Sequence, residues 1–210
     1  DSTNSIQLRV VPNEKNLVAI ANGATELYYD NVKTFSTFAD GITVQAGNNS
    51  NASIKLNADQ GDDNDDLWRL EAAASGSEFY IKNYASGGWE TNLKAIGNEG
   101  VHLYYDNSTV CYTDTNALRL NDSKYIKLGS NEDLQLIHDG SDSYISHGSV
   151  GHLFIRTAST DKAIKCVTDG GVLLHYDDAQ KLATTSSGIS VTGAIVDSTH
   201  GNVRDIPATS

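Results

Sequence analysis

An internal repeat is the feature that most constrains the fold of this chain. Residues 27–44 read LYYDNVKTFSTFADGITV, and residues 174–191 read LHYDDAQKLATTSSGISV, which aligns with the first copy without a gap. A third copy at residues 103–120 reads LYYDNSTVCYTDTNALRL, and a weaker version begins LIHDG at Leu136. One small structural unit is therefore expected to recur along the chain.

Each copy predicts three short strands joined by two tight turns. The dipeptides Asp-Asn at 30–31 and 106–107 and Asp-Gly at 139–140 close hairpins, because their second residue tolerates a positive φ. Asp-Gly at 40–41 and Ser-Gly at 187–188 mark the second turn, after which apolar residues alternate with Thr or Ser. These patterns predict an all-β chain.

Helical signals are nearly absent, and the apolar residues of the expected strands need a surface to pack against. The strongest helical candidate, residues 67–74, is short and uncapped and is interpreted as a strand. Hydrophobic residues make up 39% of the 210 residues, which leaves about two apolar positions per strand. That is too few for one chain to bury against itself. Either a single-chain solenoid or several identical chains must supply the core.

The spacing of the copies favours identical chains. The copies start at residues 27, 103 and 174, which are unequal intervals, whereas a solenoid has a short and regular period. Parallel chains wound around a common axis tolerate unequal spacing, because every residue meets its own copy. We therefore expect a parallel self-association.

The net charge of −12 argues against two classes of partner. It repels nucleic-acid phosphates and anionic membrane surfaces, and no apolar run approaches the roughly 20 residues of a membrane helix. Neither nucleic-acid binding nor membrane insertion is expected.

The sequence holds no Met, as in a fragment or a processed product. Cys111 and Cys166 are interpreted as buried thiols of a chain assembled in a reducing cytoplasm, with a disulfide as the alternative.

One acidic stretch, residues 59–66 (DQGDDNDD), is a candidate calcium site. Its closely spaced carboxylates suit a hard cation with oxygen ligands, but the opening and the final Glu of a helical-hand loop are missing. The alternative is a solvated acidic turn between strands at residues 54–56 and 68–70. The candidate ligands are Asp59, Asp62, Asp63 and Asp65.

No motif in the sequence points to catalysis. None of the six His falls in an HxH, HExxH or His/Cys cluster, and no GxSxG elbow, P-loop or dinucleotide fingerprint occurs. The abundant Asp allows the paired carboxylates of a glycosidase, which sequence alone cannot place. We expect a chain that is not an enzyme, with no catalytic residue and no cofactor beyond the possible calcium ion.

A cluster of aromatic residues is the candidate for receptor contact. Tyr80, Tyr84 and Trp89 lie close together in FYIKNYASGGWE, and exposed aromatic rings often form sugar-binding surfaces. The alternative is that these residues pack within the sheets, as the recurring Tyr of the repeats is expected to do.

The repeats resemble those of tail-fibre proteins from marine bacteriophages, including phages of cyanobacteria. The copies at residues 27–45 and 174–193 are similar to the YYDxxKKLxTTxxGxxVTG repeats of that family. Three further stretches resemble recurring segments of those fibres, and they begin at Ala58 (ADQGDDNDDLWRLEA), Asn83 (NYASGGWETNLKAIGNEGVHLYYDN) and Leu134 (LQLIHDGSDSYISHGSVGHLFIR). The closing VTGAIVDSTHGNVRDIPATS is similar to a connection that leads to a further C-terminal region in that family.

The middle copy departs from the family pattern. Thr109, Val110 and Cys111 replace the usual lysine pair and leucine, and Ala117 replaces the turn glycine. The local geometry of this copy is therefore expected to differ from that of the other two.

The resemblance implies a homotrimeric, β-rich rod on a virion that reaches the host surface. The expected fold class is all-β, an elongated repeat-containing trimeric fibre built as a β-prism or as an intertwined triple-stranded β architecture. The expected partners are parallel copies of the chain, other virion tail proteins, and a glycan or protein receptor on the host. The expected location is the extracellular virion tail fibre, after assembly in the cytoplasm of a bacterial host.

The function expected is that of a non-enzymatic shaft or adhesion segment for host attachment. The alternatives are a polysaccharide-degrading enzyme like those of tailspikes, and a bacterial surface adhesin with β repeats. The expected segments are an N-terminal strand segment (1–25), a first repeat (26–57), an acidic loop with a Trp/Tyr-rich β segment (58–100), a second repeat (101–130), an LIHDG-type β segment (131–171), a third repeat (172–193) and a C-terminal connector (194–210).

Overall fold

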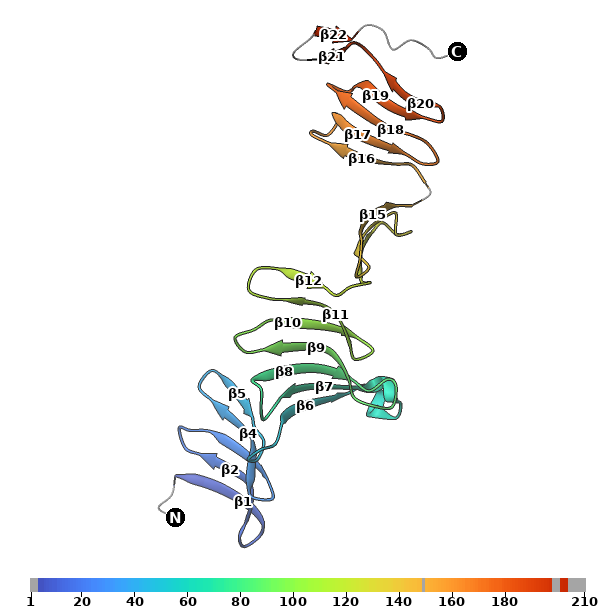
Figure 1. Cartoon of the computed structure of the whole chain (residues 1–210). Helices are drawn as coiled ribbons and strands as arrows, with labels where there is room; N and C mark the ends of the chain where they lie inside the picture. Colours follow the sequence, from blue (N-terminus) through green and yellow to red (C-terminus); the bar gives the residue numbers. More distant parts are fainter. Residues whose placement is uncertain (1–3, 149, 198–200, 204–210) are drawn as a thin grey trace. The chain divides into compact units, whose positions relative to one another are not determined.

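The computed structural model describes residues 4–148, 150–197 and 201–203, so the ends of the predicted segments 1–25 and 194–210 lie partly outside it. Within these ranges the chain is all-β, as predicted, with two single-turn 3-10 helices and no α-helix. None of the described helices is long or apolar enough to cross a membrane. The chain divides into two units, residues 1–121 and 122–210, which are described separately below (Figure 1).

Unit 1 contains two antiparallel sheets in which each strand pairs with its neighbours in sequence. The first sheet consists of β1 (Ser5–Val11), β2 (Glu14–Ile20), β3 (Thr25–Tyr29), β4 (Val32–Phe38) and β5 (Gly41–Val44). The second consists of β6 (Ala52–Asn57), β7 (Leu67–Ala72), β8 (Glu78–Asn83), β9 (Glu90–Ile96), β10 (Val101–Tyr105), β11 (Ser108–Thr113) and β12 (Leu118–Leu120). The 3-10 turns Asp59–Gly61 and Asn64–Asp66 lie between β6 and β7.

Unit 2 contains three antiparallel sheets, again in sequence order. They consist of β13 (Tyr125–Leu128), β14 (Leu134–His138) and β15 (Ser143–His147); of β16 (His152–Arg156), β17 (Lys162–Val167), β18 (Val172–Tyr176), β19 (Ala179–Thr185) and β20 (Gly188–Val191); and of β21 (Ile195–Asp197) with β22 (Gly201–Val203).

The repeat extends over five strands, two more than the sequence shows. The strands β1–β5, β8–β12 and β16–β20 are three copies of one antiparallel arrangement, which we call the first, second and third meanders. In each meander the third strand pairs with the second and the fourth strands, and the register of these pairs is the same in all three meanders. Two β-bulges also recur, one after Leu8, Ile81 and Ile155 and one after Leu27, Leu103 and Leu174.

The hairpin turn between the third and fourth strands has the geometry that its residues predict. Asp30 and Asn31 both have a positive φ, of 46° and 59°, and the equivalent residues at 106–107 and 177–178 do the same. This is the twist that a two-residue hairpin requires. The Asn31 side chain also accepts a hydrogen bond from the Lys15 N–H at 2.9 Å, and the same contact recurs at residues 107 and 178. Asn or Asp at this place therefore ties the turn to the second strand.

The middle copy keeps the geometry of the other two. Cys111 pairs with Leu120 in the same register as Phe35 with Val44. Only its second turn differs, because Asp114 accepts hydrogen bonds from the Asn116 and Ala117 N–H groups, both at 3.0 Å. The Asp114 side chain thus closes this turn, in which the other two copies have a glycine.

Two further predictions can be compared with the strands. The stretch 67–74 is a strand over β7, as interpreted. The Asp-Gly at 139–140 does close the hairpin of β14 and β15, but through a four-residue turn in which Asp139 accepts from the N–H groups of Ser141 and Asp142, both at 2.8 Å. The LIHDG segment is therefore a different hairpin from the repeat.

Very little of the described chain is buried. The only apolar side chains that are buried are Val18 and Ala183, and no large side chain among the described residues is fully covered. Each sheet is a single layer, so its two faces lack a second layer of the same unit to pack against. Stability that comes from a buried core within this one chain is correspondingly small.

Candidate functional site

One face of each meander carries an uninterrupted apolar row that crosses all five strands; we call it the ladder face. Directly paired residues share a face of a sheet, so the row follows from the register. Its members are Leu8, Leu17, Leu27, Phe35 and Val44 in the first meander, Ile81, Leu93, Leu103, Cys111 and Leu120 in the second, and Ile155, Ile164, Leu174, Leu182 and Val191 in the third.

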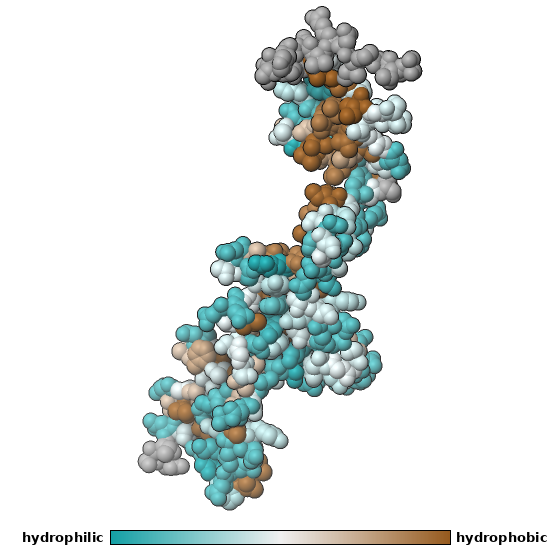
Figure 2. Space-filling view, in the orientation of Figure 1, coloured by the Kyte–Doolittle hydropathy of each residue, from teal (hydrophilic) through white to brown (hydrophobic). Residues whose placement is uncertain are grey.

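The ladder face is open to solvent in the single chain. The central residues Leu27, Leu103 and Leu174 are 42%, 45% and 39% exposed. A second row on the same face holds residues that are more exposed still, such as Ile6 and Ile189 at 75% and 69%. Figure 2 shows the apolar residues of the third meander gathered in one patch. Soluble monomers rarely leave apolar surface of this extent and continuity uncovered.

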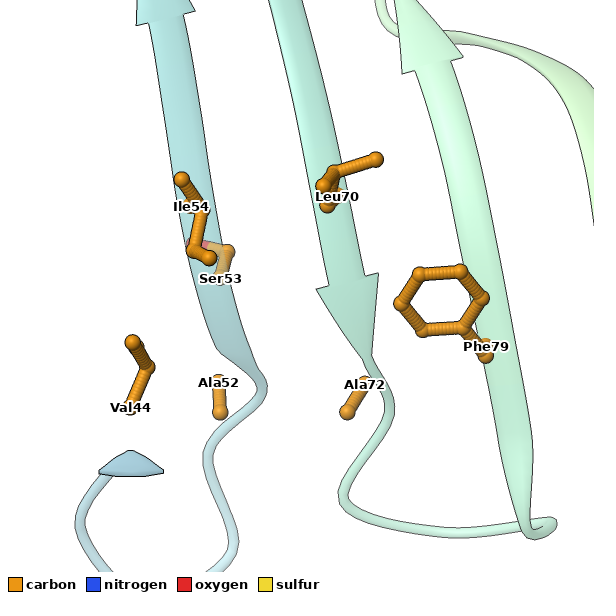
Figure 3. Close-up of a pocket in the computed structure, with 7 residues that line it drawn as sticks. All are labelled: Val44, Ala52, Ser53, Ile54, Leu70, Ala72 and Phe79. Carbon is orange, nitrogen blue, oxygen red and sulfur yellow. The ribbon is translucent and has the colours of Figure 1, made fainter. Parts of the chain in front are cut away.

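In unit 1 the apolar surface continues from one sheet to the next. Val44 of β5 and Ile54, Leu70 and Phe79 of β6–β8 line a shallow hollow of about 180 Å³, together with Ala52, Ser53 and Ala72 (Figure 3). The pairs of Ile54 with Leu70 and of Leu70 with Ile81 extend the row of the second meander to seven strands. The hollow is therefore where the apolar rows of both sheets meet.

Both cysteines lie on the ladder face. Cys111 is a member of the apolar row of the second meander. Cys166 belongs to the third meander and lies in the second row of its ladder face, opposite Leu153. Both are free and half-buried, which agrees with unpaired thiols and not with a disulfide.

The opposite face of the seven-stranded sheet carries charged and aromatic side chains. Its central row is Ser53, Glu71, Tyr80, Lys94, His102, Tyr112 and Arg119. Glu71 is 4% exposed and forms ion pairs with Arg69 at 3.0 Å and Lys82 at 2.7 Å. This face is thus organised by charge pairing, whereas none of the ion pairs of the described residues joins two members of the ladder row.

The predicted receptor residues Tyr84 and Trp89 pack against each other. The rings of Tyr84 and Trp89 meet edge to face with centroids 5.2 Å apart, and the Arg69 guanidinium lies 4.4 Å from the Trp89 ring. All three side chains are partly covered by this packing. Trp89 therefore packs against Tyr84 and Arg69 within the chain, and its contact with a receptor stays a prediction.

Tyr80, the third predicted receptor residue, contacts charged side chains. Its hydroxyl donates to Glu78 at 2.5 Å, and the Lys82 ammonium lies 4.3 Å from its ring. Lys94, at 2.5 Å, together with the Tyr80 hydroxyl, holds the pKa of Glu78 below its usual value, and the bond to Glu78 raises the pKa of Tyr80. Tyr80 is thus fixed by its charged neighbours.

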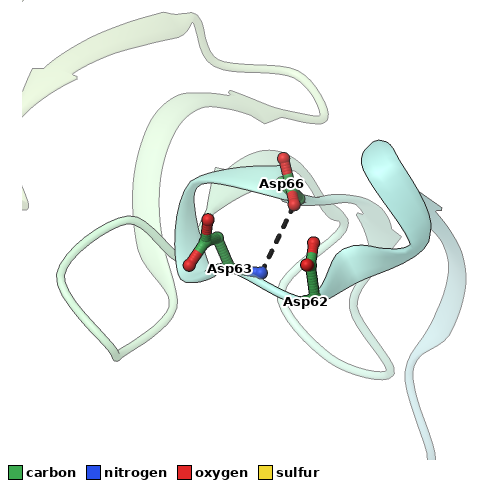
Figure 4. Close-up of side chains that lie close together, drawn as sticks. All are labelled: Asp62, Asp63 and Asp66. Carbon is green, nitrogen blue, oxygen red and sulfur yellow. Dashed lines mark hydrogen bonds between the residues drawn. The ribbon is translucent and has the colours of Figure 1, made fainter.

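The acidic turn brings together a different set of carboxylates from the predicted one. Within the described residues, the group whose ligand atoms lie within 4.8 Å of one another is Asp62, Asp63 and Asp66, so Asp66 was missed and Asp59 and Asp65 lie outside it (Figure 4). Asp63 and Asp66 cap one another, with the Asp63 N–H donating to Asp66 Oδ2 at 3.3 Å. The capping alone accounts for the proximity of these two residues.

Sequence reasoning also missed a pair of rings on the face opposite the ladder. His102 and Tyr112 are cross-strand partners whose rings stack with centroids 5.1 Å apart and planes 12° apart. The signal lay in the repeat alignment, because Ser36 and Ala183 occupy the place of Tyr112 in the other meanders.

Comparisons of this chain with models of known protein families, with curated proteins and with solved structures gave no match.

Proposed function

We propose that this chain is a non-enzymatic segment of a bacteriophage tail fibre, a parallel homotrimer that serves as shaft or adhesion segment in host attachment. The observation that carries the proposal is the open ladder face. Among the described residues only Val18 and Ala183 form a buried apolar core, so a stable fold needs its core from elsewhere. Three sister chains, each turning its ladder face toward a common axis, supply one.

Identical chains suit this surface better than a different partner. The ladder face recurs in three meanders, and a parallel arrangement places each apolar row against its own copy without any demand on the spacing between them. The same packing covers apolar surface that otherwise favours aggregation. A β-prism, with one single-layer sheet from each chain on each side, is the simplest arrangement of this kind.

The virion, the other tail proteins and the host receptor are proposed because the repeats resemble those of marine phage tail fibres. The function is then mechanical display on an extracellular fibre. The acidic turn enters the proposal as a solvated turn without an ion. No particular contact favours the tailspike-like enzyme or the single-chain adhesin, and release of reducing sugar from host polysaccharide by the purified chain would favour the enzyme.

The parallel orientation is tested by energy transfer between labels on different chains. A background with Cys111→Leu and Cys166→Ala uses residues that other meanders hold at these places, namely Leu182 and Ala19. Donor and acceptor dyes are attached to Asp40→Cys or to Ser187→Cys, which are exposed and lie in equivalent turns. We expect strong transfer in 40/40 and 187/187 mixtures and weaker transfer in 40/187 mixtures. Strongest transfer in the 40/187 mixture, or none in any mixture, would contradict the parallel trimer.

A further inference from the structure

The second meander differs from its sister copies on the face opposite the ladder. The row across that face reads Gln7, Val18, Glu26, Ser36 and Thr43 in the first meander, and Phe154, Lys165, Leu173, Ala183 and Ser190 in the third. In the second meander it reads Tyr80, Lys94, His102, Tyr112 and Arg119. The backbone is shared, so these rings are not required by the fold.

The difference is largest at the fourth position. Ser36 and Ala183 are 7% and 8% exposed, so the fold closes over a small side chain there. Tyr112 at the same place keeps part of its ring open and stacks on His102. Tyr104 continues the row of rings, with its centroid 6.3 Å from that of His102. A stack of rings on one face of one copy is a feature beyond what the shared fold needs.

These rings border a pocket. It has a volume of about 280 Å³, and it is lined by His102 and Tyr112 from β10 and β11 and by Asn98, Glu99 and Asp114 from the adjoining turns. The volume is just below the range of about 300 to 1,000 Å³ typical of pockets for drug-sized ligands. The pocket therefore suits one or two small rings.

The frame of the pocket is held rigidly. A Cβ at Gly100 would lie 1.8 Å from the carbonyl oxygen of Thr113, so the turn and the end of β11 are in close contact. The Val101 N–H also donates to Thr113 Oγ1 at 3.0 Å. The two turns that supply the polar groups are therefore fixed relative to the rings.

The pocket contains two carboxylates, and hydrogen bonds hold one of them, Asp114, in place. The N–H of Asn116, followed by the Arg119 side chain, holds the pKa of Asp114 below its usual value, so this carboxylate is ionised near neutral pH. Its three bonded donors, Asn116, Ala117 and Arg119, leave room for one more. Glu99 and Asn98 are exposed beside it. A ligand here would offer hydroxyl groups to carboxylates and an apolar face to aromatic rings.

We propose that this pocket, bounded by His102, Tyr112, Glu99 and Asp114, binds a neutral or N-acetylated hexose unit of a surface glycan. The C–H face of a pyranose ring packs on an aromatic ring, and its hydroxyl groups donate to the carboxylates. The two carboxylates repel phosphorylated and sialylated ligands, as does the chain's net charge of −12. The inference rests on the proposed function in one respect, because the ladder face must be the one covered by sister chains.

The test is saturation-transfer NMR on the assembled chain, with methyl glycosides of glucose, galactose, mannose, N-acetylglucosamine and N-acetylgalactosamine as probes and with sialic acid for comparison. Tyr112→Ala is the variant of choice, because the third meander folds with Ala183 at that place. Ser36→Ala is its matched control, since Ser36 is the equivalent residue of the first meander and the third meander holds Ala183 there. We expect transfer to at least one neutral glycoside, about tenfold weaker binding in Tyr112→Ala, and unchanged binding in Ser36→Ala.

Three results would overturn the glycan site. They are no transfer to any of the five glycosides, equal binding by wild type and Tyr112→Ala, and equal loss in Tyr112→Ala and Ser36→Ala. The mass of the same sample separates this inference from the proposed function. A trimer that binds no glycoside contradicts the pocket alone, whereas a folded monomer contradicts the self-association whatever it binds.

Discussion

Replacing Ile189 by Asp is expected to dissociate the assembly. Ile189 lies on the ladder face of β20 and is 69% exposed in the single chain. On an isolated chain, a substitution at such an exposed site changes stability by about 0.5 kcal/mol or less. Against sister chains, it removes about 2 kcal/mol of apolar burial per chain and places a carboxylate in an apolar contact, three times over. Sedimentation velocity should show loss of the trimer, and circular dichroism a large fall in melting temperature.

The neighbouring residue gives the control for this experiment. Ser190 is also exposed and lies in the same strand, but its side chain is on the opposite face. Ser190→Asp introduces the same charge into the same strand, with a smaller loss of strand propensity, so we expect a mass and melting temperature close to those of wild type. Equal effects of the two substitutions would show that the ladder face is not the surface that sister chains cover.

Replacing Glu71 by Gln is expected to destabilise unit 1 strongly. The carboxylate of Glu71 is almost fully covered, and it is the partner of both Arg69 and Lys82. The Nε atom of Arg69 is itself buried without a hydrogen-bond partner, so Arg69 depends on Glu71 all the more. Removing the negative charge leaves two mostly covered cations facing one another, at a cost of about 3 kcal/mol. We expect a fall in melting temperature of roughly 10 °C by calorimetry.

An exposed ion pair provides the comparison. Lys127 and Glu132 are 2.7 Å apart, with side chains that are 39% and 52% exposed. Glu132→Gln should therefore cost less than about 1 kcal/mol. If Glu71→Gln were as mild as Glu132→Gln, the charge pairing on the face opposite the ladder would not be a source of stability.

The fold could be predicted from the sequence wherever a turn carries its own signature. The Asp-Asn pairs at 30–31 and 106–107 close hairpins because both residues accept a positive φ, and the alternating residues after Gly41 and Gly188 form strands as expected. The first two strands of each meander were not recognised as part of the repeat. What they share is an apolar residue at each ladder position and a bulge, and such residues vary freely among Leu, Ile and Val.

The site was harder to predict, because side chains that are far apart in sequence form it. The acidic cluster was placed in the right turn, yet Asp66 was missed, since the 3-10 turn at Asn64–Asp66 decides which carboxylates converge. Tyr80, Tyr84 and Trp89 are neighbours in sequence, but their contact partners Glu78, Lys82 and Arg69 are fixed by strand pairing and could not be read from the sequence. His102 and Tyr112 meet only through the pairing of β10 with β11. These contacts depend on the pairing register of the strands, which cannot be read directly from the sequence.

The central claim is that the core of this protein forms between chains. Static light scattering on the 210-residue chain tests it most directly, because it measures mass without assuming a shape. We predict a species of three times 22.5 kDa that loses its mass and its β signal in the same thermal transition. A folded species of 22.5 kDa with the same β signal would contradict the account.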